Sequence, residues 1–442
     1  MRRIAIVLGL AAITALPGAA LAQDPNTADH PSCDERPGGS RTVRTDGFVR
    51  GLHVVSSNLP GGTYAKDPSD PNGLADRNIE CAHFDDRTSG GTVIIPWRQF
   101  DRGPDAKNRY RWGFVEDQIR PWAERGQVVN LLVWPASQKE SQLFPNGRSA
   151  TPQYVLRTGA TFQCPDGTTQ DNGSSGKFKI PKFWEARVRD RYQEALTAFA
   201  ARYDGDPRVN YFRFGIGVGA ESYPANGTTG PDNFCRENFV ALFPGDTDAQ
   251  RANRAFNTWR THALGMVRFF RELDTETPIV VTLNDFRTRS TQGVNKFPND
   301  VAREATRNHH GYPRLGLGVQ GATTADVDRW NAKPRKRCNA NWCKLFNDQK
   351  TANIPLQLQT PNHSGVNGRP GESDACPDTR NDGPAGCMTT GNLAVLMDFA
   401  RARGTNSFEL YPYEWYVVND TAFRFHGTNR DQYRGAMDRA KN

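Results

Sequence analysis

Eight short apolar runs, separated by longer amphipathic stretches, set the strongest limit on how this 442-residue chain can fold. Most of the runs are rich in Val, Ile, Leu or Phe, and several are bounded by Gly or Pro, which is typical of strands. The runs cover residues 51–56, 92–97, 128–134, 211–219, 279–284, 315–320, 355–359 and 408–411. The pattern predicts eight strands.

The stretches between the runs repeat apolar residues at helical spacing. Between residues 183 and 203, Val188, Tyr192 and Phe199 fall on one helical face, and Gly205 follows as a stop signal. Strand–helix alternation predicts parallel strands joined by crossover helices. Eight such units predict an α/β fold, a (β/α)8 TIM barrel with long loops, as a single domain over residues 47–442. An open doubly wound sheet is the alternative, but no GxGxxG motif follows the first predicted strand, and no P-loop motif occurs anywhere in the sequence.

The alternation of side chains along each run predicts which residues fill the barrel. Phe212 and Phe214 should face the helices, whereas Arg213 should face the lumen. The same reasoning predicts outward leucines at positions 317 and 358 and inward side chains at Gln320, Gln357, Gln359, Glu409 and Tyr411.

The N-terminal residues have the pattern of a secretory signal peptide over residues 1–22. Arg2 and Arg3 precede a short apolar run, and Ala20 to Ala22 form a small-residue cleavage site. Residues 23–46 form a polar extension before the barrel. Without Arg2 and Arg3 the formal net charge of +8 falls to +6. No later run is long enough to span a bilayer, so we expect a secreted or periplasmic protein with no membrane contact after cleavage.

Eight cysteines accompany this export signal. An even number in an oxidising compartment predicts disulfides that staple the loops. Cys338 with Cys343 and Cys376 with Cys387 are natural local pairs, which leaves Cys33/Cys81 and Cys164/Cys235 as longer staples; zinc ligation by Cys338 and Cys343 is disfavoured. We expect no metal and no cofactor.

Polar and aromatic side chains gather where the predicted strands end. In a barrel of this kind the carboxyl ends of the strands form the active site. Carboxylates, amides and aromatic rings suit carbohydrate, because rings stack on sugars and the polar groups hydrogen-bond hydroxyls. The candidate substrate-binding residues are Trp97, Trp134, Asn284, Gln320, Gln359, Tyr411, Glu414 and Trp415.

Glu221 and Glu409 are the candidate catalytic pair. Glycoside hydrolysis needs two carboxyl groups that flank one bond. Glu221 ends a Gly-rich strand and is the expected general acid. Glu409 is the expected nucleophile or base; its alternatives are a salt bridge to Arg213 in the lumen and the use of Glu414 in its place.

Three segments resemble the large (β/α)8 glycoside hydrolase superfamily that places its acid/base Glu at the end of strand 4, including β-galactosidase-like members. The first is residues 183–221, in which a helix ends in Arg-Tyr-Asp-Gly-Asp-Pro-Arg-Val and a Gly-rich strand then ends in Glu221. The others are Ile95 to Trp97 with Trp112, and residues 150–154. The resemblance implies a glycosidase, and the signal peptide implies that it is exported. It departs from the superfamily at strand 7, where Gln357 and Gln359 stand in place of a nucleophile Glu.

Other functions have weaker support. No GxSxG elbow or HExxH motif occurs, and the basic run 333–337 lacks the aromatic residues that stack on bases. We therefore expect a carbohydrate partner and no nucleic acid. The alternative within the same fold is a non-catalytic carbohydrate-binding or polysaccharide-processing accessory protein.

Overall fold

A computed structural model of the chain describes residues 47–56, 85–136, 150–165, 177–224, 233–284, 286, 296–308, 314–322, 341–360, 393–410 and 430–441. Its central strands coincide with the apolar runs of the sequence. They are β1 Gly51–Ser56, β2 Thr88–Pro96, β3 Val128–Trp134, β6 Val209–Phe214, β7 Ile279–Thr282, β8 Gly316–Val319, β9 Leu356–Gln359 and β10 Ser407–Leu410.

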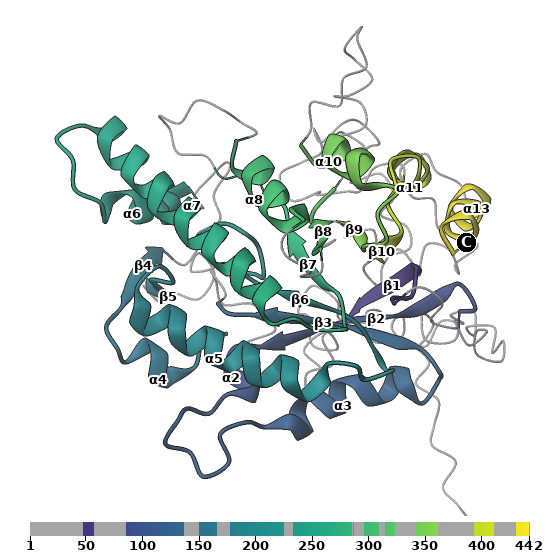
Figure 1. Cartoon of the computed structure of the whole chain (residues 1–442), viewed down its shortest axis with the longest axis horizontal. Coiled ribbons are helices and arrows are strands. Elements are labelled where there is room, and N and C mark those ends of the chain that lie inside the picture. Colours follow the sequence, from purple (N-terminus) through teal and green to yellow (C-terminus); the bar gives the residue numbers. More distant parts are fainter. Residues whose placement is uncertain are drawn as a thin grey trace, which may run out of the picture.

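These eight described strands close into a barrel in the order β1-β10-β9-β8-β7-β6-β3-β2. Every neighbouring pair is parallel, including the closing pair of β1 and β10. Figure 1 shows the strands at the centre with the helices around them. The predicted TIM barrel is therefore confirmed.

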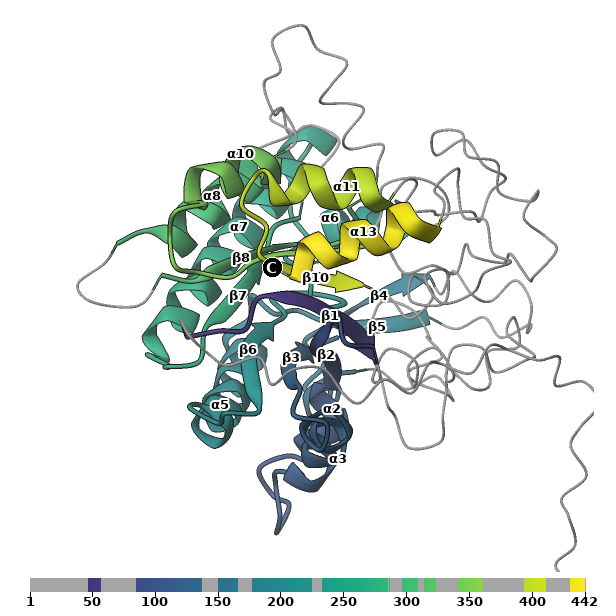
Figure 2. The same cartoon turned by 90° about the vertical axis from the view of Figure 1, so that its right-hand side faces the viewer.

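Amphipathic helices cover the outside of the barrel. The described helices are α2 Trp97–Phe100, α3 Trp112–Ala123, α4 Gln153–Leu156, α5 Ala186–Tyr203, α6 Asn233–Ala241, α7 Asp248–Glu272, α8 Lys296–Thr306, α10 Asn341–Gln349, α11 Leu393–Arg401 and α13 Arg430–Lys441. The C-terminal helix α13 packs against α11 and β1, as the turned view in Figure 2 shows. The last helix thus covers the strand that begins the barrel.

The predicted alternation of side chains is confirmed. Phe212, Phe214, Leu317, Leu358 and Phe408 all belong to the apolar core between the strands and the helices. Residues of opposite parity fill the lumen, and many of these are polar. TIM-barrel lumens are usually packed with branched apolar side chains, so a polar lumen is a distinctive property of this chain.

A small accessory unit extends two of the connections that leave the carboxyl ends of the strands. An antiparallel pair, β4 Thr161–Pro165 and β5 Lys177–Pro181, lies between β3 and α5 in the sequence. Helix α6, which follows β6, packs against β4. Both additions belong to the end of the barrel at which the sequence predicts the active site.

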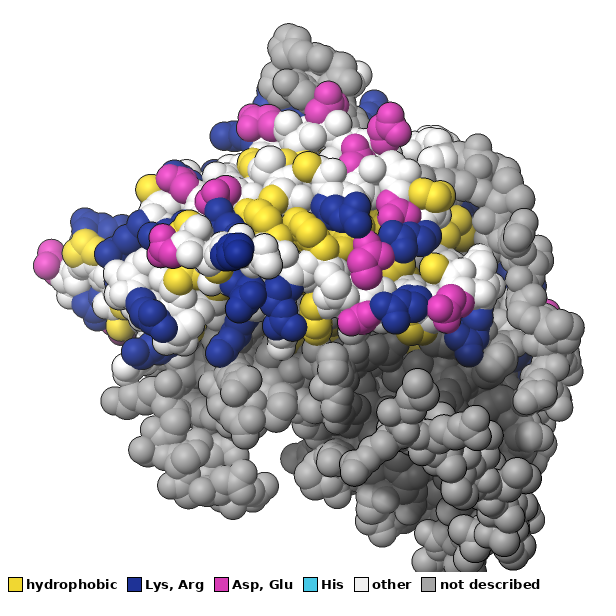
Figure 3. All heavy atoms as spheres, turned by 90° about the horizontal axis from the view of Figure 1, so that it is seen from below, with side chains coloured by type: hydrophobic (Ala, Val, Ile, Leu, Met, Phe, Trp, Pro, Cys, Tyr) yellow, Lys and Arg dark blue, Asp and Glu magenta, His cyan; other side chains and the backbone are white. Residues whose placement is uncertain are grey.

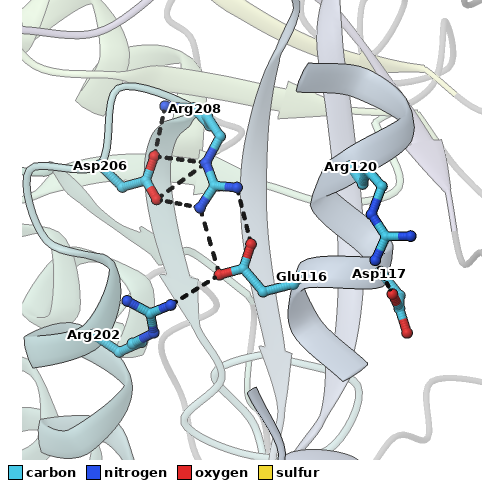
Figure 4. Close-up of polar contacts among 6 residues, drawn as sticks. All are labelled: Glu116, Asp117, Arg120, Arg202, Asp206 and Arg208. Atoms are coloured by element: carbon cyan, nitrogen blue, oxygen red, sulfur yellow. Dashed lines mark hydrogen bonds and ion pairs between the residues drawn. The ribbon is translucent and has the colours of Figure 1, made fainter. Parts of the chain in front are cut away.

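Ion pairs join α3 to the segment that enters β6. Arg208, directly before β6, donates to both Asp206 and Glu116, and Arg202 of α5 also donates to Glu116 (Figure 4). Asp117 and Arg120 form a separate exposed pair on α3. On the face in Figure 3, Asp and Glu side chains lie among the Lys and Arg side chains.

The described residues bear only in part on two predictions for the whole chain: the membrane segments and the disulfides. Within the described ranges, no helix combines the length and apolar character needed to cross a membrane. No cysteine in those ranges is free. Cys33, Cys81, Cys338, Cys376 and Cys387 lie outside the described residues, so the pairing of the eight cysteines stays a prediction.

Candidate active site

Four neighbouring strands bring the candidate residues together at one end of the barrel. Trp134 ends β3, Glu221 follows β6, Asn284 follows β7 and Gln320 follows β8. Asn284 hydrogen-bonds the Glu221 carboxyl. Gln320 contacts the same carboxyl when its amide nitrogen faces Glu221 and its amide oxygen faces Arg213. The structure thus brings together Glu221, Asn284 and Gln320, three residues that the sequence analysis assigned to the candidate site.

A tight backbone turn sets the position of Glu221. The predicted strand 211–219 ends early, at Phe214, and the chain then folds back on itself. Gly219 and Ala220 both have a φ of 60°, and the Glu221 amide donates to the Val218 oxygen at 3.0 Å. These are the features of a two-residue turn with both central residues left-handed. Left-handed backbone at a residue other than glycine is uncommon and clusters at functional sites.

Backbone contacts hold this turn against the barrel. The Gly217 and Ile216 amides donate to the Glu221 carbonyl oxygen at 2.8 and 3.2 Å, and the Gly219 amide donates to Ala136 at 2.8 Å. The Ala220 side chain is buried in a small apolar cluster of the upper lumen, formed with Val55, Ile94 and Leu132 and covered by Trp134. The turn therefore directs Glu221 towards the barrel mouth.

Ser222 and Asn284 lock the turn to the next strand. The backbone N–H of Ser222 donates to Asn284 Oδ1 at 2.8 Å, and the backbone N–H of Asn284 donates to Ser222 Oγ at 3.1 Å. Trp259 Nε1 of α7 donates to the Ser222 oxygen at 2.8 Å. The sequence analysis missed Ser222; its only signal was its place directly after Glu221. This clamp orients the Asn284 side chain that contacts the Glu221 carboxyl.

The surroundings of Glu221 favour its protonated form. Burial raises the pKa of the Glu221 carboxyl from 4.5 to about 8, while the Arg213 charge and the Asn284 hydrogen bond lower it by less. The residue keeps some exposed surface, although protein atoms enclose the carboxyl itself. A carboxyl that holds its proton at neutral pH can act as a general acid.

Glu409 lies deeper in the lumen than Glu221, and both of its carboxylate oxygens already have partners. Its side chain has no exposed surface, and its Oε2 ion-pairs with Arg213. Tyr211 Oη donates to Glu409 Oε1 at 2.8 Å. Of the two alternatives weighed from the sequence, the lumen salt bridge with Arg213 is present.

Polar contacts continue into the lower lumen. Asn210 Nδ2 donates to Asn130 Oδ1 at 2.9 Å and lies 3.2 Å from His53 Nε2, while His53 Nδ1 lies 3.3 Å from Ser407 Oγ. Burial lowers the pKa of His53 from 6.5 to about 3, so its ring is neutral at physiological pH. These side chains fill the lumen and support the layer above them.

Two predicted substrate-binding residues are buried instead. Trp97 begins helix α2 and has no exposed surface; its Nε1 donates to Asp101 at 3.0 Å, and its ring packs on Tyr154 and Tyr192. The prediction that Trp97 stacks on sugar is therefore wrong. Gln359 is 3% exposed and its Oε1 accepts from Arg213 Nη2 at 3.0 Å, so its amide supports the lumen rather than the cleft.

The remaining predicted residues divide into two groups. Trp134 is partly exposed at the end of β3 and stays a candidate for stacking on sugar. Tyr411, Glu414 and Trp415 lie outside the described residues. In the part of the chain that the structure describes, no group of three or more His, Cys, Asp or Glu side chains could hold a metal ion.

Comparisons with known proteins give only distant matches. No protein-family model matches the chain, and no curated protein is similar to it. Similar solved structures include a β-galactosidase from the Antarctic haloarchaeon Halorubrum lacusprofundi, with 12% identity and a TM-score of 0.43, covering 88% of this chain and 57% of that one. Endoglycoceramidase II from Rhodococcus sp. has 15% identity and a TM-score of 0.40, covering 83% and 73%.

A β-galactosidase from the psychrophilic Marinomonas ef1 is similar at 9% identity and a TM-score of 0.42, covering 88% of this chain and 59% of that one. The chain thus spans less than two thirds of the length of either β-galactosidase. At these scores the likenesses carry no argument about activity, which has to come from the site.

Proposed function

We propose that this protein is an exported glycoside hydrolase in which Glu221 is the general acid. The observation that carries the proposal is one carboxyl group, held at the mouth of a TIM barrel by Asn284 and Gln320, whose pKa lies near 8. Such a group gives its proton to the oxygen of the departing sugar as the glycosidic bond breaks. The export part of the proposal rests on residues 1–22 alone.

The reaction needs a second carboxylate. Glu409 and Glu414 are the two candidates from the sequence, and Glu409 is enclosed by Arg213 and Tyr211. A partner about 5–5.5 Å from Glu221 would give a covalent intermediate and retained configuration, whereas about 6.5–9.5 Å would admit a water and give inversion. Product stereochemistry, followed by NMR, distinguishes the two.

The substrate is an oligosaccharide or polysaccharide. Trp134 provides an aromatic surface, while Asn284 and Gln320 provide amides for sugar hydroxyls. The amides already contact Glu221, so a sugar that binds them is placed beside the acid.

Glu221→Gln tests the proposal directly. The amide keeps the shape of the side chain but cannot donate the proton, so we expect the hydrolysis rate to fall by at least ~10²–10⁴-fold. Activity is measured on a panel of oligosaccharides and polysaccharides with unactivated leaving groups, and binding by calorimetry. Glu272→Gln, at an exposed position of α7, is the matched control and should leave the rate unchanged. Wild-type turnover in Glu221→Gln would remove Glu221 from the mechanism.

A non-catalytic carbohydrate-binding or processing role is the second candidate. The burial of Glu409 favours it, because a carboxylate that is enclosed in the lumen and paired with Arg213 is not exposed to a substrate. This role predicts sugar binding without bond cleavage in the wild-type protein, and equal binding by the Glu221→Gln variant.

A further inference from the structure

A buried arginine lies between the two candidate carboxyl groups. Arg213 and Glu409 have no exposed side-chain surface, and Arg213 Nη1 ion-pairs with Glu409 Oε2. Arg213 Nη2 donates to Gln359 Oε1 at 3.0 Å and also faces the amide oxygen of Gln320. Since the Gln320 nitrogen faces Glu221, a single amide separates the guanidinium from the Glu221 carboxyl.

The charge of Arg213 needs a partner. A guanidinium stays protonated in proteins, and an unpaired buried charge is strongly unfavourable. Two carboxyl groups could pair with it, Glu409 from β10 and Glu221 from the turn after β6. Pairing with Glu221 would require Glu221 to lose its proton, and an ionised Glu221 is no longer an acid.

We propose that Glu409 is a positioning residue and not the nucleophile: by binding Arg213, it leaves Glu221 free to hold its proton. The proposal rests on the proposed function and assigns Glu409 a role within the same site. Tyr211 Oη and Ser407 Oγ, 3.0 Å apart, support this role because Tyr211 also donates to the second oxygen of Glu409. Both oxygens of Glu409 are thereby committed to the lumen.

The described groups that face Glu221 come from three elements and their loops. Arg213 projects from β6, and Tyr223 lies two residues after Glu221. Asn284 follows β7 and Gln320 follows β8. Arg213 carries the positive charge in this set, and the pKa of Tyr223 is raised by burial and by Glu221. Arg213 itself faces Glu409, Gln359 and Thr282, the last at 3.3 Å. The protonation of Glu221 is therefore most sensitive to whether Arg213 is paired.

The test measures the pKa of Glu221 without any substrate. The unfolding free energy is measured against pH for the wild-type protein and for Glu409→Gln, each with and without Glu221→Gln, and the difference within each pair gives the pKa of Glu221. In Glu409→Gln the unpaired Arg213 should lower that pKa by about one to three pH units. An unchanged pKa would overturn the proposal.

A double variant keeps the test decisive if Glu409→Gln does not fold. Arg213→Met combined with Glu409→Gln removes both charges of the pair, which proteins tolerate far better than the loss of one. Here the pKa of Glu221 should equal or exceed the wild-type value, because the cation that lowers it is gone. A lowered pKa of Glu221 in the double variant would contradict the proposal.

Azide separates a positioning residue from a nucleophile. If Glu409 were the nucleophile, azide would attack the anomeric carbon in Glu409→Ala as the glycosidic C–O bond breaks and the departing oxygen takes its proton from Glu221. Turnover would then be restored, with glycosyl azide and the released alcohol as products. We expect no such rescue, and instead an alkaline limit of activity displaced to lower pH in Glu409→Gln. A wild-type protein without glycosidase activity would refute the proposed function, while the substrate-free pKa measurement would still decide the role of Glu409.

Discussion

At the scale of single residues, Glu221 links the candidate chemistry to stability. The pKa of Glu221 is about 8 in the folded protein, against the ordinary glutamate value of 4.5 that applies to the unfolded chain. Below pH 4.5 both the folded and the unfolded chain carry the proton, so the group costs nothing. Between pH 4.5 and 8 only the unfolded chain releases it, so the folded state loses stability as the pH rises. The acid therefore carries a stability cost at neutral pH.

Replacing Glu221 should remove that cost. We expect Glu221→Gln to be more stable than the wild-type protein, by an amount that grows from pH 4.5 to about 8 and then levels off. The difference should reach a few kcal/mol, since each pH unit is worth ~1.4 kcal/mol and the residue is partly exposed. Urea unfolding at several pH values measures it, with Glu272→Gln as the exposed control. A difference that is constant with pH would disprove the raised pKa.

At the scale of elements, the turn after β6 determines where the acid stands. A side chain cannot fit at Gly217, because an added Cβ would lie 1.9 Å from the Tyr223 oxygen and 3.1 Å from the Trp259 ring. The same glycine donates its amide to Glu221. The packing of the turn and the position of the proposed acid, Glu221, therefore both depend on Gly217.

Gly217→Ala should disturb both the packing of the turn and the position of Glu221. Overpacking of this kind costs ~1–3 kcal/mol, and the displaced backbone should move Glu221 and reduce the hydrolysis rate well beyond the loss of folded protein. Gly265→Ala is the matched control, because a Cβ there meets no atom within 4 Å and α7 should gain up to ~1 kcal/mol. Thermal unfolding and activity per folded molecule test the pair. A Gly217→Ala variant with normal stability would show that the turn relaxes.

The sequence predicts the strands well and the turn poorly. Periodicity identifies buried strands because every second side chain faces the helices, and this correctly separates Phe212 and Phe214 from Arg213. Periodicity does not mark where pairing stops: Ile216 and Val218 continue the alternation, yet Gly219 and Ala220 turn the chain back. Depth in the lumen is also hidden, because it depends on the stagger between strands. Trp97 was wrongly expected in the cleft for another reason: it begins α2 and packs, like Val93 and Ile95, in the apolar core between the strands and the helices.

At the scale of the whole molecule, the two ends of the barrel have different tasks. In TIM barrels generally, residues at the N-terminal end of the strands contribute to stability, whereas reactive groups lie at the C-terminal end. The Glu116, Arg202 and Arg208 contacts in Figure 4 join α3, α5 and the segment before β6. Glu221 stands beyond the opposite end of that strand.

Glu116→Gln should therefore affect stability alone. The side chains of Glu116, Arg202 and Arg208 are 25%, 50% and 38% exposed, so the expected loss is ~0–1 kcal/mol. Unfolding midpoints and hydrolysis rates are compared with those of the wild-type protein at low and high salt. A change in rate per folded molecule would show that the two ends are coupled.

The eight cysteines allow a second prediction for the whole chain. We expect four disulfides in the mature protein. Titration of the denatured, unreduced protein should find essentially no thiol, and reduction should release all eight. Two or more reactive thiols before reduction would contradict the prediction.

Closure of the barrel also has a consequence for synthesis. Ser407 of β10 meets His53 of β1 across 354 positions of the sequence, so the strand that closes the ring is made long after the strand with which it pairs. Until it arrives, β1 and β9 expose unpaired edges to other chains. Contacts this distant in sequence also slow folding. Until β10 pairs with both neighbours, the folding chain is therefore exposed to edge-to-edge association with other chains.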